Sequence, residues 1–515
     1  MPLAGTIVQD KYLDSVKLMT ISKEIKARAG VTEAVAISAS AENKAILKAT
    51  DMLLPEFEKA PESSILIAIL ADTDEICQAA IADAKEHLNR KPVAREGSAR
   101  LLPTSIESGL KSLPEANLAL ISVAGKHAAR EAFKALNLGL HVMLFSDNVA
   151  LVDELKLKQL AVSKELLMMG PDCGTAIING VPLAFANKVR PGGIGIVSAA
   201  GTGLQAVCCE IHRRGEGISQ AFGTGGRDGK KQIGGLMILQ CLDFLMQDPA
   251  TEVIVLICKL PDNAVIDRIM AKLERSDKPV VINFLSPERK QDLPNIFFGN
   301  TLSETAEKAC RLMQDKNGNN GSRDDAHQFN NRSLVQLPIR PTRRYLRGLF
   351  SGGTLCYEAQ LIFHRATGIH AFSNAPLSQE HKLENAWQSK EHTLIDMGAD
   401  EFTVGRPHPM IDFSLRLKKL AEEMTDTDCA VILMDVVLGF GSHPKPQEEL
   451  IPLIRQIKRD TCIVPICSVI GTDLDPQNMQ GVIDGLREAG AIVTTSNSEA
   501  CALAAKLILE IGRQA

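Results

Sequence analysis

Short, nearly continuous apolar runs alternate along the chain with stretches of helical periodicity. Runs such as SILIAILA, EVIVLICKL and CAVILMDVV are rich in Val, Ile and Leu, which is typical of strands covered on both faces of a parallel sheet. Between such runs, KHAAREAFKAL and ETAEKACRLM have the spacing of amphipathic helices. The alternation predicts an α/β fold with mostly parallel sheets and right-handed crossovers.

One polar segment interrupts this pattern. Residues 315–333 read DKNGNNGSRDDAHQFNNRS and carry no apolar period. A stretch this rich in Asn, Gly and charged residues cannot bury a core, so we expect a linker over residues 315–339.

The sequences on the two sides of that linker resemble one another. GIVSAAGTGLQ (Gly195–Gln205) corresponds to GLFSGGTLCYE (Gly348–Glu358), and DPATEVIVLICKLP (Asp248–Pro261) to DTDCAVILMDVVLG (Asp426–Gly439). Matching segments follow in the same order on both sides, which indicates an internal repeat. We therefore predict two homologous α/β domains over residues 190–314 and 340–515, preceded by an N-terminal domain over residues 1–189.

Composition excludes several classes of protein. The 515 residues contain 57 Lys and Arg against 62 Asp and Glu, a net charge of −5, which argues against nucleic-acid binding through a broad basic surface. Aromatic residues make up 4%, too few to suggest base-stacking modules. The 12 cysteines are dispersed without a CxxC pair, as in a reduced, cytoplasmic protein. No run of 18 apolar residues indicates a membrane span.

Each repeat carries a small-residue loop between a strand and a helix. A helix N-terminus has unsatisfied N–H groups and a partial positive charge, and small residues let an anion approach them. We predict that the two loops face one another and hold one phosphoryl or carboxyl group; the alternative is that the small residues only form tight turns. The candidate anion-binding residues are Ser198, Gly201, Thr202 and Gly203 in the first loop, and Ser351, Gly352, Gly353 and Thr354 in the second.

Other residues are candidates for the same site. Gly225 and Gly226 of the GTGG sequence lie near a predicted strand end, although ordinary turn glycines would give the same pattern. His408 is flanked by two prolines in GRPHPMID, and such a ring suits a phosphoryl acceptor, a general base or an anion-binding group. The alternative for His408 is a loop that caps the following helix. No HExxH motif or paired Cys/His cluster is present, so no metal site is predicted.

Several segments resemble a known superfamily. MGPDCGTAIINGVPLAFAN (Met169–Asn187) and GIVSAAGTGLQ are similar to the α subunit of succinyl-CoA synthetase, and IDMGADE and VILMDVVLGFG to the CoA-ligase domain of its β subunit. VMLFSDNV, GTGGRD, SGGTL and VGRPHPMID resemble the FdrA-like branch of these NDP-forming acyl-CoA ligases. The resemblance implies an N-terminal Rossmann-like domain of the CoA-binding type followed by two flavodoxin-like domains.

The chain also departs from that superfamily. The KPVV strand at residues 278–281 is followed by INFLSPERKQDLP, without the α subunit's phosphohistidine. CoA is the cofactor that the resemblance implies, although its glycine-rich loop is not recognisable, and we expect no ATP-grasp domain in this chain. Partner subunits, a homo-oligomer or both are therefore expected.

Three functions remain open from the sequence. The first is an acyl-CoA synthetase-like subunit that handles an acyl phosphate or thioester. The second, which the resemblance to the FdrA-like branch implies, is a carbamoyltransferase subunit of oxamate or ureide nitrogen catabolism that uses carbamoyl phosphate. The third is a non-catalytic scaffold subunit. The first two both require a site for a small phosphorylated carbonyl compound.

Overall fold

The computed structural model describes residues 1–9, 15–40, 43–44, 47–48, 50–89, 103–288, 290–316, 343–403 and 407–514. The linker predicted over residues 315–339 lies almost entirely outside these described residues. The chain divides into two compact units. The first consists of Met1–Leu102 and Ala399–His408, and the second of Pro103–Gly398 and Pro409–Ala515.

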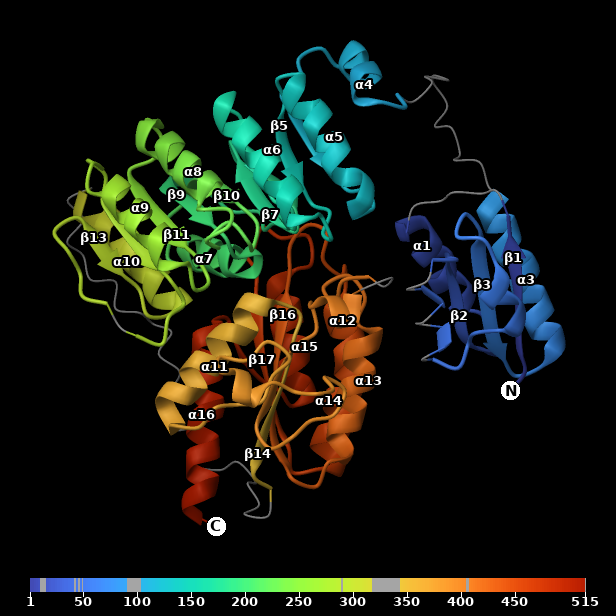
Figure 1. Cartoon of the computed structure of the whole chain (residues 1–515). Coiled ribbons are helices and arrows are strands. Elements are labelled where there is room, and N and C mark those ends of the chain that lie inside the picture. Colours follow the sequence, from blue (N-terminus) through green and yellow to red (C-terminus); the bar gives the residue numbers. More distant parts are fainter. Residues whose placement is uncertain are drawn as a thin grey trace. The chain divides into compact units, whose positions relative to one another are not determined.

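The first unit contains a three-stranded antiparallel sheet with the order β1-β3-β2 (Figure 1). Helices α1 and α3 pack on one face, and a second apolar cluster around Phe57 covers the other. The elements are β1 (Leu3–Val8), α1 (Ser15–Lys26), β2 (Val31–Ser38), η1 (Pro55–Lys59), β3 (Ile65–Ala71), α3 (Asp74–Asn89) and α12 (Asp400–Thr403).

This sheet differs from the sequence-based expectation of one Rossmann-type domain over residues 1–189. The run SILIAILA forms the central strand β3, and its alternate residues are buried on opposite faces, Ile67 towards the helices and Leu66 towards Phe57. A continuously apolar strand indicates burial on both faces of the sheet, but it does not indicate whether the neighbouring strands run parallel or antiparallel to it. The pattern was therefore consistent with an antiparallel sheet as well.

The second unit begins with a small parallel sheet of order β4-β5-β6. Its core is continuous with the side of the next sheet that α8 covers, through residues such as Met168 and Met237. The elements are α4 (Ile106–Ser112), β4 (Leu118–Ile121), α5 (Gly125–Asn137), β5 (His141–Leu144), α6 (Leu151–Ser163) and β6 (Met168–Met169).

A seven-stranded sheet follows, with the order β13-β12-β11-β9-β10-β7-β8. Five strands are parallel, and the hairpin β7–β8 pairs antiparallel at one edge. This sheet thus begins at Thr175, before the predicted boundary at 190. The elements are β7 (Thr175–Ile178), β8 (Val181–Ala184), β9 (Pro191–Ser198), α7 (Gly201–Arg213), β10 (Ile218–Gly223), α8 (Leu236–Gln247), β11 (Val253–Ile257), α9 (Asn263–Leu273), β12 (Val280–Asn283), β13 (Ile296–Phe298) and α10 (Leu302–Lys316).

The last sheet has five parallel strands in the order β15-β14-β16-β17-β18. When only the five parallel strands of each large sheet are numbered along the chain, both sheets place the second strand first, followed by the first, third, fourth and fifth, which is the flavodoxin-like order. The elements are β14 (Tyr345–Phe350), α11 (Gly353–Thr367), η3 (Gln379–His381), β15 (Thr393–Asp396), α13 (Ser414–Thr425), β16 (Cys429–Val437), α14 (Pro446–Asp460), β17 (Val464–Ile470), α15 (Met479–Ala489), β18 (Ile492–Thr494) and α16 (Asn497–Gln514).

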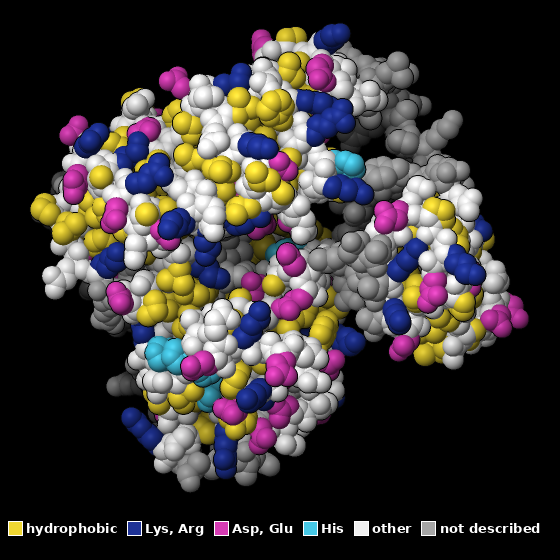
Figure 2. Space-filling view, viewed as in Figure 1, with side chains coloured by type: hydrophobic (Ala, Val, Ile, Leu, Met, Phe, Trp, Pro, Cys, Tyr) yellow, Lys and Arg dark blue, Asp and Glu magenta, His cyan; other side chains and the backbone are white. Residues whose placement is uncertain are grey.

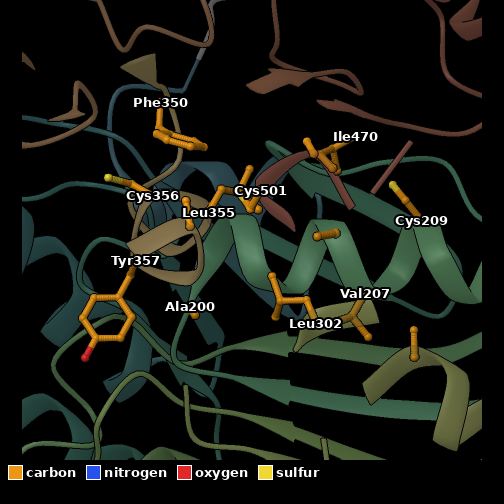
Figure 3. Close-up of a cluster of buried hydrophobic side chains, with 14 of the residues drawn as sticks. Ala200, Val207, Cys209, Leu302, Phe350, Leu355, Cys356, Tyr357, Ile470 and Cys501 are labelled. Carbon is orange, nitrogen blue, oxygen red and sulfur yellow. The ribbon is translucent and has the colours of Figure 1, made fainter. Parts of the chain in front are cut away.

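The two large sheets share one hydrophobic core (Figure 3). Helices α7 and α10 from the first half contribute Val207, Cys209 and Leu302, and helices α11 and α16 from the second contribute Leu355 and Cys501. The predicted α/β fold class with parallel sheets is confirmed. None of the described helices is long and apolar enough to cross a membrane.

Candidate functional site

The two predicted anion loops follow the first strand of each large sheet. Strand β9 lies between β10 and β11, and β14 lies between β15 and β16. The order in which the chain adds strands to each sheet therefore reverses at β9 and at β14, which makes these positions topological switch points. Open α/β sheets bind ligands at the carboxyl ends of the strands beside such a switch point. The loops at residues 198–203 and 351–354 therefore occupy the usual ligand-binding position of their own sheets.

The loops contact one another directly. An added Cβ atom on Gly352 would lie 2.6 Å from Thr202 Oγ1, and one on Gly203 would lie 2.8 Å from Thr354 Cγ2. Each threonine thus packs against a glycine of the other loop. Ala200, the residue before α7, belongs to the same buried cluster as Leu355 and Tyr357 of α11 (Figure 3). The N-termini of α7 and α11 meet in the way that the sequence repeat suggested.

The first loop is held by its own serine. The buried Ser198 hydroxyl donates to the Ala200 carbonyl at 2.8 Å and accepts from the Ala200 N–H at 3.1 Å. The first helical bond of α7 runs from the Leu204 N–H to the Ala200 carbonyl. The preceding N–H groups at Gly201, Thr202 and Gly203 have no intrahelical acceptor.

The second loop is organised around a buried carboxylate. The N–H groups of Ser351 and Gly352 donate to the Asp435 carboxylate at 2.8 and 2.9 Å, and the Ser351 hydroxyl donates to it at 2.9 Å. Asp435 is fully buried and lies 3.2 Å from Arg416 Nη2. The Asp435 carboxylate therefore already accepts from two of the N–H groups that were predicted to bind a ligand anion.

Arg416 is a fully buried guanidinium with few partners. Its Nη2 donates to the main-chain carbonyls of Asp435 and Leu349, and its charge lies over the Phe413 ring at 5.0 Å. Burial lowers the pKa of this arginine, against the opposing effect of Asp435. The pair stabilises the end of β16 where the second loop docks.

The GTGG segment borders the first loop, because the Thr224 N–H donates to the Ser198 carbonyl at 2.8 Å. Gly225 has φ +86°, and an added Cβ would clash with the main chain at Gly170 and Pro171, whereas Gly226 is exposed with no atom within 4 Å of such a Cβ. The following Asp228 accepts from the Ile238 N–H at 2.7 Å and from Lys158 at 2.8 Å. These contacts give the segment a structural role at the start of α8.

His408 and His443 have different surroundings. His408 ends the segment Ala399–His408, which groups with the first unit, and its role at the loops stays a prediction. His443, which follows the GFG turn, is buried; its Nδ1 accepts from the Lys445 N–H, and its ring packs on Phe413. These contacts explain His443 as part of the packing around α13.

Sequence reasoning missed three charged residues near the loops: Lys259, Asp396 and Asp435. Each stands at the end of, or within, an apolar strand run. Lys259 follows β11 and Asp396 ends β15, so both lie at carboxyl ends of strands next to a first strand. The signal that would have found them is a charge placed where the pattern predicts full burial.

The described surface mixes both charge signs. Figure 2 shows Lys and Arg interspersed with Asp and Glu on the face in view, without a continuous patch of either sign. A small anion would therefore be recognised by local donors rather than by a broad field.

The chain resembles known proteins over two segments and over its whole length. The profile of the CoA-ligase family matches residues 349–507, and that of the AllF heavy metal-associated domain matches residues 1–102. The protein YahF of Escherichia coli K12 is 42% identical over 516 residues, covering 99% of each chain. The chain belongs to the YahF family.

More distant relatives cover part of this YahF-family chain. Subunit alpha 1 of the ADP-forming succinate–CoA ligase of Archaeoglobus fulgidus is 25% identical over 170 residues, 32% of this chain and 57% of the relative. SauD, a subunit of the ADP-forming sulfoacetate–CoA ligase of Bilophila wadsworthia, is 24% identical over 163 residues, 30% of this chain and 54% of SauD. The chain thus spans a little over half the length of these ligase subunits.

The chain is also similar to a solved structure. The dinucleotide-forming acetyl-coenzyme A synthetase 1 of Candidatus Korarchaeum cryptofilum, in complex with phosphate and ADP, has 14% sequence identity and a TM-score of 0.33, covering 82% of this chain and 88% of that one. The CoA-ligase domain and the relatives place the chain in the NDP-forming CoA-ligase superfamily. The narrower FdrA-like assignment stays a prediction.

The heavy metal-associated domain does not carry the residues that its name implies. Residues 1–102 contain one cysteine, Cys77, and one histidine, His87. The Cys77 thiol is buried and donates to main-chain carbonyls, and His87 pairs with Glu24. Soft metals need several converging thiolate or imidazole ligands, and the described residues contain no group of three or more His, Cys, Asp or Glu that could hold a metal ion.

The small parallel sheet offers a place that fits a phosphate of a CoA-type cofactor. Helix α5 begins directly after the β4 turn, where Ala124 and Lys126 are exposed. Its N–H groups and the lysine charge are the donors that nucleotide phosphates use in Rossmann-type folds. The residues present are thus compatible with such a group.

Proposed function

We propose that this protein is a subunit of an acyl-CoA ligase-type enzyme that binds a phosphorylated carbonyl compound between its two switch-point loops. The observation that carries the proposal is the direct contact of the two loops, Thr202 against Gly352 and Thr354 against Gly203. Similarity to ligase subunits over the first half, and to the CoA-ligase domain over the second, supports the same conclusion.

The chain's own residues would bind and orient the phosphoryl group. The free N–H groups of the first turn of α7 and the positive end of α11 point at the same junction, and the Thr202 and Thr354 hydroxyls add neutral donors. When a thiol attacks the carbonyl carbon of an acyl phosphate, the carbon–oxygen bond to phosphate breaks and inorganic phosphate leaves with the bonding pair. Donors fixed on that phosphate stabilise the developing negative charge.

A CoA-type cofactor would supply the thiol in this reaction. Residues Ala124–Lys126 at the start of α5 would hold one of its phosphates. The role of this chain is then to hold the acyl phosphate still and to exclude water, because hydrolysis competes with transfer.

Carbamoyl phosphate is a second candidate substrate for the same loops. It combines a phosphoryl group with a small carbonyl, the two features that the proposed loop site would recognise. The acceptor would then be an amine or amide nitrogen instead of a thiol.

The test uses the full chain purified with any subunits that accompany it. One reaction contains carbamoyl phosphate and oxamate, and another contains CoA, ATP and succinate. Thioester formed only with CoA and ATP supports the ligase assignment, with the ATP site on a partner. Carbamoyl product formed without ATP or CoA supports the second candidate. Both candidates would be contradicted if the complex forms neither product and the wild-type chain binds neither acyl phosphate nor carbamoyl phosphate.

A further inference from the structure

Lys259 reaches the junction of the two halves. Lys259 follows β11, the strand next to β9 at the first switch point. Its ammonium lies 4.4 Å from the centre of the Tyr357 ring, on the second turn of α11. Figure 3 shows the Tyr357 side chain extending away from the apolar cluster. Lys259 thus bridges from the first sheet to the helix of the second loop.

This lysine is half-buried without a close carboxylate. In the described part of the chain the Lys259 ammonium contacts the Tyr357 ring, and no ion pair within 4.0 Å involves it. Burial lowers the pKa of Lys259, and the Asp396 carboxylate opposes that lowering. A desolvated ammonium whose main contact is an aromatic face retains hydrogen-bond donors for a ligand.

Asp396 connects this lysine to the second loop. It ends β15, and an added Cβ on Gly353 would clash with its carboxylate, so it lies beside the start of α11. Its main chain is fixed by Asn374, whose side chain bonds both the Asp396 N–H and its carbonyl. The carboxylate is therefore held at a defined place beside the start of α11.

The backbone beside Lys259 is strained. Leu260 has φ +41°, in the left-handed region that residues with a Cβ rarely adopt. Its side chain is 42% exposed, so packing of that side chain does not account for the conformation. Strained backbone conformations of this kind cluster at functional sites, where they orient a neighbouring functional side chain.

We propose that Lys259 is the charged donor that binds the phosphoryl group of the substrate at the loop junction, with Asp396 as the residue that positions it. This rests on the proposed function and adds the charge that the neutral loop donors lack. On binding, the ammonium moves from the Tyr357 ring to a phosphoryl oxygen. Charge-assisted bonds to phosphate are stronger than the cation–π contact that is given up.

The test measures equilibrium binding of acetyl phosphate and of carbamoyl phosphate by titration calorimetry. Lys259→Met keeps the length and the apolar stem but removes the charge, and it should weaken binding about 10-fold to 100-fold. Lys259→Arg should retain most of the affinity. The matched control is Lys290→Met, because Lys290 also lies over an aromatic ring, Phe284 at 4.9 Å, but outside the junction.

A second variant tests the positioning residue. Asp396→Asn removes the charge that favours the ammonium, so the pH at which binding declines on the alkaline side should move down relative to the wild type. A purely structural role for Asp396 would lower affinity equally at every pH. Thermal unfolding of each variant identifies those that do not fold. If Lys259→Met does not fold, the Lys259→Arg and Asp396→Asn titrations decide whether Lys259 binds the phosphoryl group.

The outcomes separate the two proposals. If the wild-type chain binds neither compound, the proposed function fails. If the wild type binds one of them and Lys259→Met binds equally well, the proposed function stands and the role of Lys259 is overturned. Loss in Lys259→Met with retention in Lys259→Arg and Lys290→Met supports both.

Discussion

The two switch-point loops have similar sequences but different internal chemistry. In the first, the Ser198 hydroxyl bonds to the main chain of Ala200, and the N–H groups of the first helical turn have no intrahelical acceptor. In the second, Ser351 and Gly352 donate to the Asp435 carboxylate, which Arg416 accompanies. The same strand–loop–helix pattern therefore gives one loop with open donors and one closed by an internal anion.

The difference comes from one strand position. In the matched segments Asp248–Pro261 and Asp426–Gly439, Ile257 of the first occupies the position of Asp435 in the second. Ile257 ends β11 beside Ser198, and Asp435 lies on β16 one place after Met434, which pairs with Leu349. An isoleucine in one repeat is thus an aspartate in the other. We infer that the first loop supplies most donors to a ligand, and that the second contributes its threonine and its helix dipole.

The largest effect should come from removing the internal anion. Asp435→Leu gives this strand position an apolar side chain, as in the first repeat, but leaves Arg416 buried without its carboxylate. Breaking one partner of a buried pair costs about 3–5 kcal/mol, which urea unfolding would measure as a reduced free energy of unfolding. Ile257→Leu is the control at the equivalent position and should cost under about 1.5 kcal/mol. A cost below about 1 kcal/mol for Asp435→Leu would show that the pair does not organise the loop.

Acid should also affect the second half selectively. Burial holds the pKa of His392 at about 4, and its Nδ1 accepts from the Leu346 N–H of β14 at 3.1 Å. Between pH 4 and about 6.5 the unfolded chain binds this proton and the folded chain does not, so stability is complete above pH 6.5 and is lost as the pH falls towards 4.

The size of the His392 contribution is at most about 3 kcal/mol. His392→Asn retains an acceptor for the Leu346 N–H but does not titrate, so the variant's free energy of unfolding should depend less on pH over this interval. Urea unfolding at a series of pH values makes the comparison. Parallel pH curves for the two proteins would contradict this account.

The packing of the loops on each other should be sensitive to one methyl group. Gly352→Ala places a Cβ against Thr202, and relief requires the two helix N-termini to separate. We expect a loss of about 1–3 kcal/mol, as for other overpacked sites. Gly109→Ala is the control, because its added Cβ meets no atom within 4 Å. Equal stability of the two variants would mean that the loops are not in contact in solution.

The smallest effect should distinguish the two loop serines. Ser198→Ala leaves the buried Ala200 N–H without its acceptor, at a cost of about 1 kcal/mol. Ser351→Ala should cost less, because Asp435 still accepts from two N–H groups. Thermal unfolding of the two variants measures the difference. A larger loss in Ser351→Ala would reverse the comparison.

The sequence predicted the parts of the fold that depend on repetition and periodicity. The matching segments around Ser198 and Ser351 predicted two related sheets whose loops come together. The apolar run SILIAILA could not reveal whether its neighbours were parallel, because burial on both faces produces the same pattern. Asp435 and Lys259 were missed because they sit within or directly after apolar runs, and their partners Arg416 and Asp396 come from other elements. His408 was chosen from its flanking prolines, which do not determine which unit a segment joins.

The central claim is that the two loops together bind a phosphorylated carbonyl compound. It is tested most directly by titrating acetyl phosphate and carbamoyl phosphate into the wild type and the Thr202→Val, Thr354→Val double variant. Valine preserves the γ-carbon packing on Gly352 and Gly203 and removes only the hydroxyls. We predict that the double variant binds at least about 100-fold more weakly, because two hydrogen bonds to a charged group are lost. Equal affinity in the two proteins would contradict the assignment of the site.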